Sequence, residues 1–509
     1  MTRLTHLFIL VCASLLVTGC SLLAPKYERP AIDVPASWSK VELSSLPLNV
    51  DWWQRFNDPV LTALVEEALK YNQDLAESLA RVNSAAARAG VNASVLFPRV
   101  DGIGQGGAQS SSGNLANSPD YAHQPDANRS FITYNAGLTA SWELDLFGKN
   151  YNTYRMLTDV MLATIVSHEA LRLSVARQTA ENYFVLLALD MQLNTARRTL
   201  KTREEAFRIY SSRYKQGDIT ELDWQRARAE VETARAQVHT STMAVDQAEA
   251  ALAVLLGRSP RDIMERSMDR GKAIAKLPAP PVLPEGLPSQ LLWRRPDIRA
   301  AEYTLIANNA GIGAARAQFF PTISLTAGVN AMSSGLLNLF TPLSGAWNYG
   351  VSGNLPILDF GRNWYNLKDA HAQKEASIAA YRKAVQAAFM DVRTSLTKQR
   401  ESDAIVKSMQ VQVDSLRRAV DIARLQYENG YTDYLTVLDA ERQLFTSELQ
   451  LANALRDRLN AVVAVCMALG GGWDDPGNNG GFAPFMRVER LVQEKTSAGK
   501  LQKKKQEQL

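Results

Sequence analysis

The chain contains few of the side chains that carry out chemistry in proteins. Its 509 residues include three cysteines and five histidines, and no two histidines have the spacing of a metal site. No nucleophile with an accompanying base and no phosphate-binding glycine loop can be recognised. The formal net charge is only +4, so net charge indicates no nucleic-acid surface. The sequence therefore argues against an enzyme, a metal or cofactor site and a nucleic-acid-binding protein.

Long apolar runs are also absent, except at the N-terminus. No run of eighteen apolar residues follows it, so we expect no membrane-spanning helix in the mature chain. Arg3, an apolar stretch from Leu7 to Val17, and LeuValThrGlyCys ending at Cys20 resemble a bacterial lipoprotein signal. We predict that residues 1–19 are a signal peptide and that Cys20 carries S-diacylglycerol and N-palmitoyl groups. An ordinary signal peptide with an incidental cysteine is the alternative.

The remaining cysteines indicate no disulfide. Cys12 lies in the predicted signal peptide, and Cys466 lies in an apolar stretch typical of a small buried side chain. We therefore predict a mature chain without disulfides. By resemblance to lipoproteins, Ser21 after the lipidated cysteine favours sorting to the outer membrane.

Glycine and proline are missing from two long stretches. Lys149 to Tyr214 and Arg362 to Asn429 contain neither residue, so each predicts one helix of about 100 Å. Return helices are expected over Thr220–Leu256 and Thr432–Leu469, each roughly 55 Å long. The helices predicted from Pro59 to about Leu96 and over 296–319 would stack on the return helices and complete their length.

What the chain does contain is a repeat. LeuPheGly and AspPheGly end at Gly148 and Gly361 (361 − 148 = 213). The same offset separates TyrLysGlnGly, ending at Gly217, from TyrGluAsnGly, ending at Gly430, and the LeuGly at Gly257 from the LeuGly at Gly470. The repeats span 60–256 and 296–470, with 257–295 between them. A repeat unit that does not bury its own surface completes its core against its copies.

Each repeat also contains strand-like segments. Residues 131–142, 323–331 and 347–357 alternate apolar and polar side chains, 99–110 alternate weakly, and 111–130 resemble an exposed loop. A soluble, half-buried hairpin is one interpretation. The other is a membrane strand, since 10 to 12 residues reach about 33–40 Å. Four membrane strands leave open edges, and three copies would close them into a barrel of twelve.

A soluble coiled-coil rod is the alternative reading of the helices. It does not explain why strand pairs are inserted at matching points of both repeats. The C-terminal tail is polar and basic, and composition favours a solvated tail over a binding site.

Five segments of the chain form a recognisable set. They are CysSerLeuLeuAlaProLysTyrGluArgPro at 20–30, TrpTrpGlnArgPheAsnAspProValLeu at 52–61, LeuProSerGlnLeuLeuTrpArgArgProAspIleArgAlaAlaGlu at 287–302, PhePheProThrIleSerLeu at 319–325 and TyrGluAsnGlyTyrThrAspTyrLeuThrValLeuAspAlaGluArg at 427–442. Together they resemble the TolC-like outer membrane factors, in particular the lipoprotein branch that serves resistance-nodulation-division efflux pumps. The ArgArgProAspIle block is the most specific of them.

The resemblance implies an α+β membrane protein that is a homotrimer. A twelve-stranded β-barrel in the outer membrane, in contact with its lipids, would continue into a twelve-helix α-barrel in the periplasm. An equatorial domain would be built from 20–59, 257–295 and 471–509. A periplasmic adaptor (membrane fusion) protein would join the duct to a proton-driven inner-membrane pump, because the chain has no energy-converting site of its own.

The resemblance also implies roles for the two helical turns. Gly217 and Gly430 are suited to end helices, and Asp218 or Thr432 to begin the next ones. Well-formed turns without a further role are the plain interpretation. The family places the adaptor contact there, which implies that role for Arg213, Tyr214, Gly217, Tyr427 and Gly430.

A closed gate is expected at the same end of the helices. Leu435, Asp439 and Arg442 share one helical face. Threefold symmetry would turn each position into a ring, with an apolar constriction and charges that latch neighbouring helices. An ordinary surface ion pair is the alternative.

The sequence predicts efflux of small toxic compounds, with an ABC-type protein-secretion duct and a non-transport periplasmic scaffold as alternatives. The lipoprotein signal and the ArgArgProAspIle block argue against the secretion duct. Whether the cargo is drugs, metals or solvents is not encoded in any recognisable pocket, because a duct for many solutes needs little selectivity.

Overall fold

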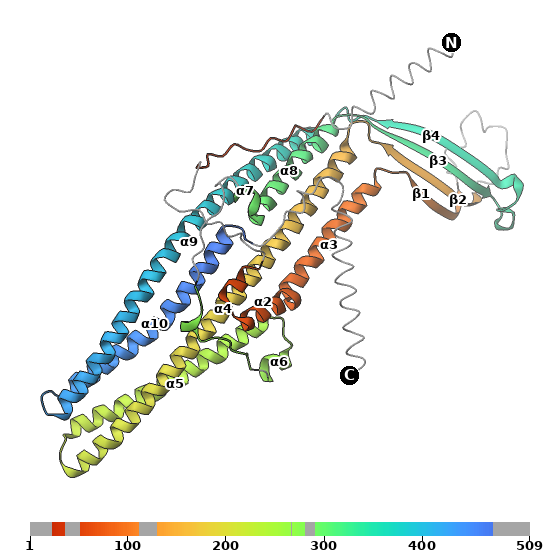
Figure 1. Cartoon of the computed structure of the whole chain (residues 1–509). Helices are drawn as coiled ribbons and strands as arrows, with labels where there is room; N and C mark the ends of the chain where they lie inside the picture. The colour runs from red at the N-terminus through yellow and green to blue at the C-terminus, as the bar shows by residue number, and fades with distance from the viewer. Residues whose placement is uncertain (1–22, 36–50, 111–129, 266, 280–290, 472–509) are drawn as a thin grey trace. The chain divides into compact units, whose positions relative to one another are not determined.

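The computed structural model describes residues 23–35, 51–110, 130–265, 267–279 and 291–471 (Figure 1). The helices are η1 (Trp52–Phe56), α2 (Pro59–Tyr71), α3 (Gln73–Ser94), α4 (Lys149–Gln216), α5 (Glu221–Leu255), α6 (Pro260–Glu265), η4 (Ile274–Lys276), α7 (Leu291–Arg294), α8 (Pro296–Ala317), η6 (Leu336–Asn338), η7 (Pro342–Ser344), α9 (Arg362–Glu428) and α10 (Tyr434–Ala468). The strands are β1 (Arg99–Ser110), β2 (Ser130–Leu144), β3 (Thr322–Ser333) and β4 (Gly345–Asn354). In these ranges no helix combines the length and apolar character of a membrane span.

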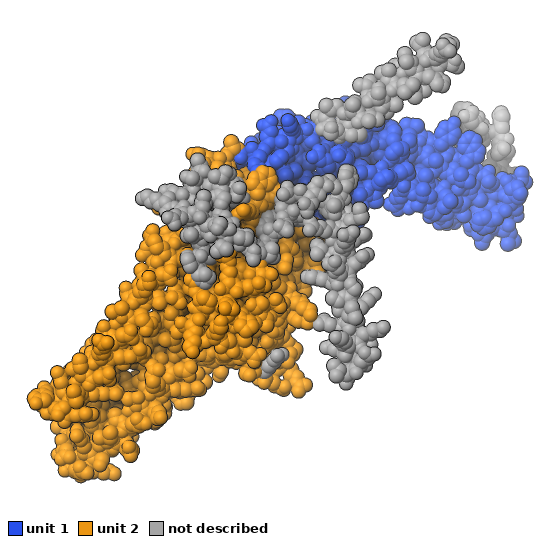
Figure 2. Space-filling view, viewed as in Figure 1, with its two compact units in different colours: residues 1–30, 83–162, 302–380 blue, residues 31–82, 163–301, 381–509 orange. Residues whose placement is uncertain are grey.

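Several predictions concern residues outside these ranges. They are the signal peptide, the lipid on Cys20, the loop between β1 and β2, and the C-terminal tail. The described chain divides into two compact units, coloured separately in Figure 2. Unit 1 comprises 1–30, 83–162 and 302–380, and unit 2 comprises 31–82, 163–301 and 381–509.

Unit 1 contains an antiparallel four-stranded sheet in the order β1-β2-β3-β4 (Figure 1). The two hairpins join where β2 pairs with β3, and the register aligns Leu138 with Val329 and Val329 with Trp347. The apolar side chains of neighbouring strands therefore share one face, as the alternation predicts. Leu138, Val329 and Trp347 are 59%, 69% and 72% exposed, so the described residues leave this face uncovered.

The opposite face of the sheet is polar. Asn330 donates to Asn135 across β2 and β3 (3.1 Å). Gly137 lies on the same face, where a Cβ would meet the carbonyl oxygen of Val329 at 2.4 Å. The predicted extension of the last strand to Ile357 is wrong, because β4 ends at Asn354. Pro356 has no amide hydrogen to donate to a sheet.

The first described residues of unit 1 lie along α8. Arg29 forms an ion pair with Glu302 (Nε–Oε1 2.6 Å), to which the Tyr27 hydroxyl also donates (3.2 Å). Asn309 donates to the carbonyl of Pro25 and Arg316 to that of Leu23. We call residues 23–30 the N-terminal strap. It runs antiparallel to α8 and joins two of the motif segments, which are far apart in the sequence.

Unit 2 contains most of two long helical hairpins, α4 with α5 and α9 with α10 (Figure 1), while the first residues of α4 and α9 belong to unit 1. The predicted helices match these closely: α4 has 68 residues, α9 has 67, and α5 and α10 have 35 each. The main core lies here, where Phe56 packs against Phe184 with ring centroids 5.0 Å apart. Cys466 is also fully buried, as predicted, and burial raises the pKa of its thiol to about 12.

The single helix predicted from Pro59 to about Leu96 is divided into α2 and α3 by Asn72. The side-chain oxygen of Asn72 accepts from the amide of Leu75 and so begins α3, while its Nδ2 donates to the carbonyl of Leu255 (2.8 Å). Gly257 approaches the same break so closely that a Cβ would meet the carbonyl oxygen of Tyr71 at 2.0 Å. The break therefore depends on contacts with the far end of α5, which local sequence does not reveal.

The 213-residue repeat has a direct structural counterpart. Among the described glycines, those with positive φ are the three repeated anchor pairs: Gly148 and Gly361, Gly217 and Gly430, Gly257 and Gly470. Glycine adopts this conformation without the strain that a Cβ would cause. The repeat thus fixes where each long helix begins and where the helices of each hairpin end.

Candidate functional site at the helical tips

Each hairpin turns at a glycine with left-handed backbone. Gly217 follows α4 with φ of 81°, and Gly430 follows α9 with φ of 78°. In the first turn Gly217 donates to the carbonyl of Tyr214 (3.0 Å) and Asp218 to that of Arg213 (2.9 Å), and the second turn has the same two bonds. A Cβ at either glycine would meet no atom within 4 Å. The backbone conformation, and not crowding, therefore requires glycine here.

The residues that begin the return helices differ from those predicted. Thr220 caps α5 by accepting from the amide three residues later (3.2 Å), and Asp433 caps α10 in the same way (3.0 Å). The prediction of Asp218 is wrong because its amide closes the preceding turn. The prediction of Thr432 is wrong by one position, and its hydroxyl donates instead to that of Thr436 (3.0 Å). The two actual caps are themselves equivalent in the repeat.

Three tyrosines join the two tips. Tyr210 of α4 lies 6.0 Å from Tyr427 and 4.4 Å from Tyr434 between ring centroids. They form a small core apart from the main one, the tip cluster, whose other buried members are Ala227, Ala423, Val437 and Leu438. Burial raises the pKa of Tyr210 and of Tyr434 above the usual range. Their rings therefore stay neutral and hold the first hairpin to the second.

The residues that the resemblance assigns to an adaptor contact fall into two groups. Arg213, Tyr214, Gly217 and Gly430 are exposed at the turns. Tyr427 is half-buried in the tip cluster, so only part of its ring is accessible. The structure thus brings four of the five to the surface and gives the fifth a packing role as well.

The three predicted gate residues share one exposed face of α10. Leu435 is 51% exposed, and Asp439 and Arg442 are also exposed. The Asp439 carboxylate accepts a hydrogen bond from Gln443 (2.7 Å), and in the described chain it forms no ion pair with Arg442. The alternative of an intrahelical surface pair therefore has no support in the protomer.

A hollow of about 480 Å³ lies beside the tip cluster and is lined by residues of both tips. Its lining includes Ile219 and Arg226 from the first tip and Tyr427, Asp433 and Leu435 from the second. Of the three predicted gate residues, Leu435 therefore borders this open space next to the first hairpin.

Sequence reasoning missed the ion pairs that connect α10 to its neighbours. Glu448 is only 6% exposed and accepts from Arg198 of α4 (2.6 Å) and Arg417 of α9 (2.8 Å). Arg424 of α9 pairs with Glu441 of α10 (2.6 Å). The available signal was the seven-residue spacing of Glu441 and Glu448, which places both on one helical face. These contacts tie the second hairpin together and link it to α4.

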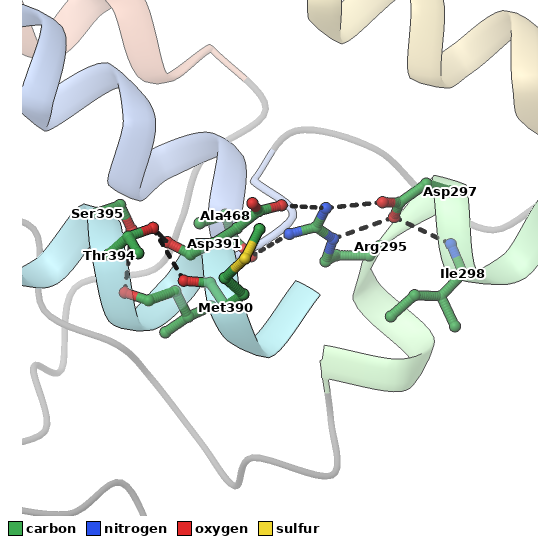
Figure 3. Close-up of polar contacts among 9 residues, drawn as sticks. Arg295, Asp297, Ile298, Met390, Asp391, Thr394, Ser395 and Ala468 are labelled. Carbon is green, nitrogen blue, oxygen red and sulfur yellow. Dashed lines mark hydrogen bonds and ion pairs between the residues drawn. The ribbon is translucent and has the colours of Figure 1, made fainter. Parts of the chain in front are cut away.

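The ArgArgProAspIle block forms a junction of three helices (Figure 3). Arg295 is 9% exposed and donates to Asp297 near the start of α8, to Asp391 of α9 and to the carbonyl of Ala468 at the end of α10. Asp297 also accepts from the amide of Ile298 (2.9 Å). Burial opposes the charge of Arg295, but the two carboxylates hold its pKa above the usual range. This motif is therefore a structural clamp within unit 2.

Known proteins similar to this chain agree with this geometry. The family described as "Outer membrane efflux protein" matches residues 64–258 and 287–471. The solvent efflux pump outer membrane protein SrpC of Pseudomonas putida is 34% identical over 473 residues, covering 91% of this chain and 97% of that protein. The cation efflux system protein CusC of Escherichia coli is 35% identical over 468 residues, covering 91% and 98%.

A solved structure agrees with these relatives. The Campylobacter jejuni CmeC outer membrane channel superposes with a TM-score of 0.84 at 25% identity, covering 93% of this chain and 98% of that one. With 93% of this chain covered, the likeness concerns most of its architecture.

Proposed function

Since this chain belongs to the family of outer membrane efflux proteins, we propose that three copies of it form the exit duct of a tripartite efflux pump. The chain is an outer membrane efflux protein with the fold of the outer membrane factor channels. Beyond this family membership we propose the trimer, the partner proteins, the gate and the lipid anchor.

The open sheet of unit 1 carries the proposal. Among the described strands, β1 pairs only with β2 and β4 pairs only with β3, so each leaves one edge unpaired. One face of the same sheet is apolar and uncovered. Unpaired backbone groups are not tolerated in hydrocarbon, so a sheet in a membrane must close. Three copies supply twelve strands, an even number typical of such barrels, with the polar face around the lumen.

Oligomeric state and conductance test this proposal directly. Purified protein in mild detergent should run as a heat-sensitive trimer on gels, and its mass by light scattering should be that of three chains. In planar bilayers it should open a pore. A monomer without conductance would contradict the closed barrel.

We assign the adaptor contact to the exposed parts of the two turns, at Arg213, Tyr214, Gly217, Gly430 and the accessible edge of Tyr427. A periplasmic adaptor would dock there and connect the duct to a proton-driven inner-membrane pump. The support is their exposure on rigid, glycine-terminated turns. The duct itself has no catalytic role in this scheme and needs no cofactor.

We assign the resting gate to Leu435, Asp439 and Arg442. Their shared exposed face leaves the charges available to neighbouring copies, and among the described residues Asp439 and Arg442 form no ion pair with each other. Three leucines would narrow the lumen, while aspartates and arginines from adjacent copies would hold the helices together.

We propose lipidation of Cys20, supported by the position of the N-terminal strap. Leu23, held by Arg316, is three residues from Cys20, a reach of at most about 11 Å. Arg316 lies near the end of α8, six residues before β3 begins at Thr322. The strap therefore directs the chain toward the end of α8 from which the sheet starts, where lipid would be accessible.

We also propose an equatorial domain from residues 20–59, 257–295 and 471–509. In unit 2 part of this set packs on the long helices. Arg270 pairs with Asp190 through two hydrogen bonds (2.9 and 3.1 Å) and with Glu249. Asp58 accepts from the hydroxyl of Tyr183 (3.0 Å).

The cargo does not follow from similarity. A relative named for solvents and a relative named for cations are almost equally similar to this chain. We propose small toxic compounds as the class. A deletion strain tested against solvents, metal ions and antibiotics would identify which of these compounds the duct exports. Unchanged sensitivity to all of them would contradict the proposal that the cargo is a small toxic compound.

A further inference from the structure

The loop between β3 and β4, residues 334–344, displays large apolar side chains without cover. Leu336, Leu337, Phe340 and Leu343 are 61%, 98%, 83% and 99% exposed. Among the large apolar side chains of the loop, Leu339 alone is buried, at 5%. No charged residue occurs between Arg316 and Asp359, so the loop and both strands of its hairpin are entirely uncharged. Apolar groups exposed in such a cluster mark an interaction surface.

Part of the backbone of this loop is hydrogen-bonded within the loop. In η6 and η7 the amides of Asn338, Leu339, Thr341 and Ser344 each donate to the carbonyl three residues earlier. The Thr341 and Ser344 hydroxyls both donate to the carbonyl of Asn338 (2.9 and 2.6 Å). A loop in water has no need of this, because water would satisfy the same groups. These bonds reduce the cost of approaching an apolar phase, while the remaining amides of the loop need the polar head-group region, because unsatisfied backbone is not tolerated in hydrocarbon.

The apolar loop continues the apolar face of β4. Trp347 and Tyr349 stack with ring centroids 5.7 Å apart and are 72% and 78% exposed. Both lie on the face that the proposed barrel turns toward lipid, and Leu343 precedes Trp347 by four residues. Tryptophan and tyrosine on such a face typically mark the membrane–water interface.

We propose that the β3–β4 loop lies at the boundary between head groups and acyl chains of the outer leaflet, with its leucine and phenylalanine side chains in the acyl region, and anchors the rim of the duct in lipid. The inference rests on the proposed barrel. Another copy of the chain is a poorer occupant, because protein interfaces also use hydrogen bonds at their rim. Here the hydroxyls and turn amides are already used within the loop. Lipid chains require none.

Site-specific fluorescence tests this insertion. Cys466 is buried with a raised thiol pKa, and Cys20 would be acylated, so an introduced cysteine can be labelled selectively. Leu337→Cys and Leu343→Cys, each labelled with an environment-sensitive dye, would be reconstituted in phosphatidylethanolamine–phosphatidylglycerol vesicles. Spin-labelled acyl chains serve as the lipid quencher and iodide as the aqueous one. Tyr349→Cys reports the lipid face, and Asn348→Cys reports the polar face.

Insertion predicts blue-shifted emission at Leu337 and Leu343, with strong quenching by the acyl label and weak quenching by iodide, as at Tyr349. Quenching by iodide at both loop positions, with Tyr349 still in lipid, would overturn the insertion and leave the barrel intact. Resistance to both quenchers, with crosslinking of the two cysteine variants between copies, would assign the loop to a subunit contact and also overturn it. Iodide access at Tyr349 would instead contradict the barrel itself.

Discussion

The two helical tips are equivalent in the repeat but differ in charge. Leu222 and Leu435 occupy matching positions and are 58% and 51% exposed. One turn further, the first tip has Arg226 where the second has Asp439 (439 − 226 = 213). The counterpart of Arg442 is an alanine. The repeat thus preserves the backbone and an apolar position, while only the second tip has an acidic and a basic group on the leucine face.

The same contrast holds for packing. Tyr214 and Tyr427 are equivalent, yet Tyr214 stacks on Trp224 (5.5 Å) at the surface while Tyr427 joins the tip cluster. The two copies of one duplicated tyrosine therefore have different roles. The first tip offers its aromatic side chain to solvent, and the second uses it to hold the two hairpins together. Matched substitutions at repeat-related positions can separate these roles.

The largest effect is expected at the gate. Asp439→Ala combined with Arg442→Ala removes the charges that would latch neighbouring copies. Single-channel conductance in planar bilayers should therefore rise several-fold. Arg226→Ala, the matched change in the first tip, should leave conductance unchanged. Equal conductance of the double variant and the parent would remove the gate from this face.

The next effect is on stability. Glu448→Ala removes a nearly buried carboxylate that accepts from Arg198 and Arg417, whose side chains are themselves 61% and 48% exposed, so the loss should be roughly 2 kcal/mol. Its repeat counterpart, Arg235, forms ion pairs on the surface with Glu204 and Glu232. We expect faster hydrogen exchange along α10 for Glu448→Ala.

Arg235→Ala should show no measurable change in α5, because exposed pairs contribute little. Comparable exchange in the two variants would show that burial does not distinguish the two ion-pair sites.

A smaller difference should separate the equivalent tyrosines. Tyr427→Ala removes ring contacts with Tyr210 and Tyr434, and each aromatic pair contributes about 0.5–1.5 kcal/mol. Tyr214→Ala removes one stack at the surface. Hydrogen exchange at the C-terminal end of α4 and the N-terminal end of α10 should increase more in Tyr427→Ala than in Tyr214→Ala. If Tyr214→Ala loosened both hairpins equally, the tip cluster would not be what joins them.

The sequence predicted what depends on local pattern. Gly217 and Gly430 were recognisable because a helix that must stop and turn needs a left-handed residue, and strand faces followed from alternation. The break at Asn72 was not recognisable, because it needs the carbonyl of Leu255, 183 residues away. The strap contact between Arg29 and Glu302 joins residues still farther apart, 273 positions from each other in the sequence.

The same division applies to the candidate site. The exposed face with Leu435 follows from helical spacing alone. The partners of Glu448 come from two other helices, and no spacing within α10 reveals which arginines reach it. The helix caps were missed for a different reason, since moving a cap by one or two residues within a short polar turn changes little in the local pattern.

The smallest expected effect is a pH response confined to the second tip. Hydrogen bonds from the Thr436 hydroxyl and amide, and the nearby charge of Arg226, lower the pKa of Asp433 in the folded chain. This cap therefore stabilises α10 above the unfolded pKa of about 4 and loses that contribution as pH falls through the lower folded value. The Thr220 hydroxyl that caps α5 does not titrate in this range. After correction for intrinsic exchange rates, acidification should loosen the first turn of α10 more than that of α5. Asp433→Asn keeps a capping side chain without a titrating group, so it should abolish the difference. A response that persists in this variant would have to originate in another carboxylate, and the two caps would then be equivalent in function as well as in position.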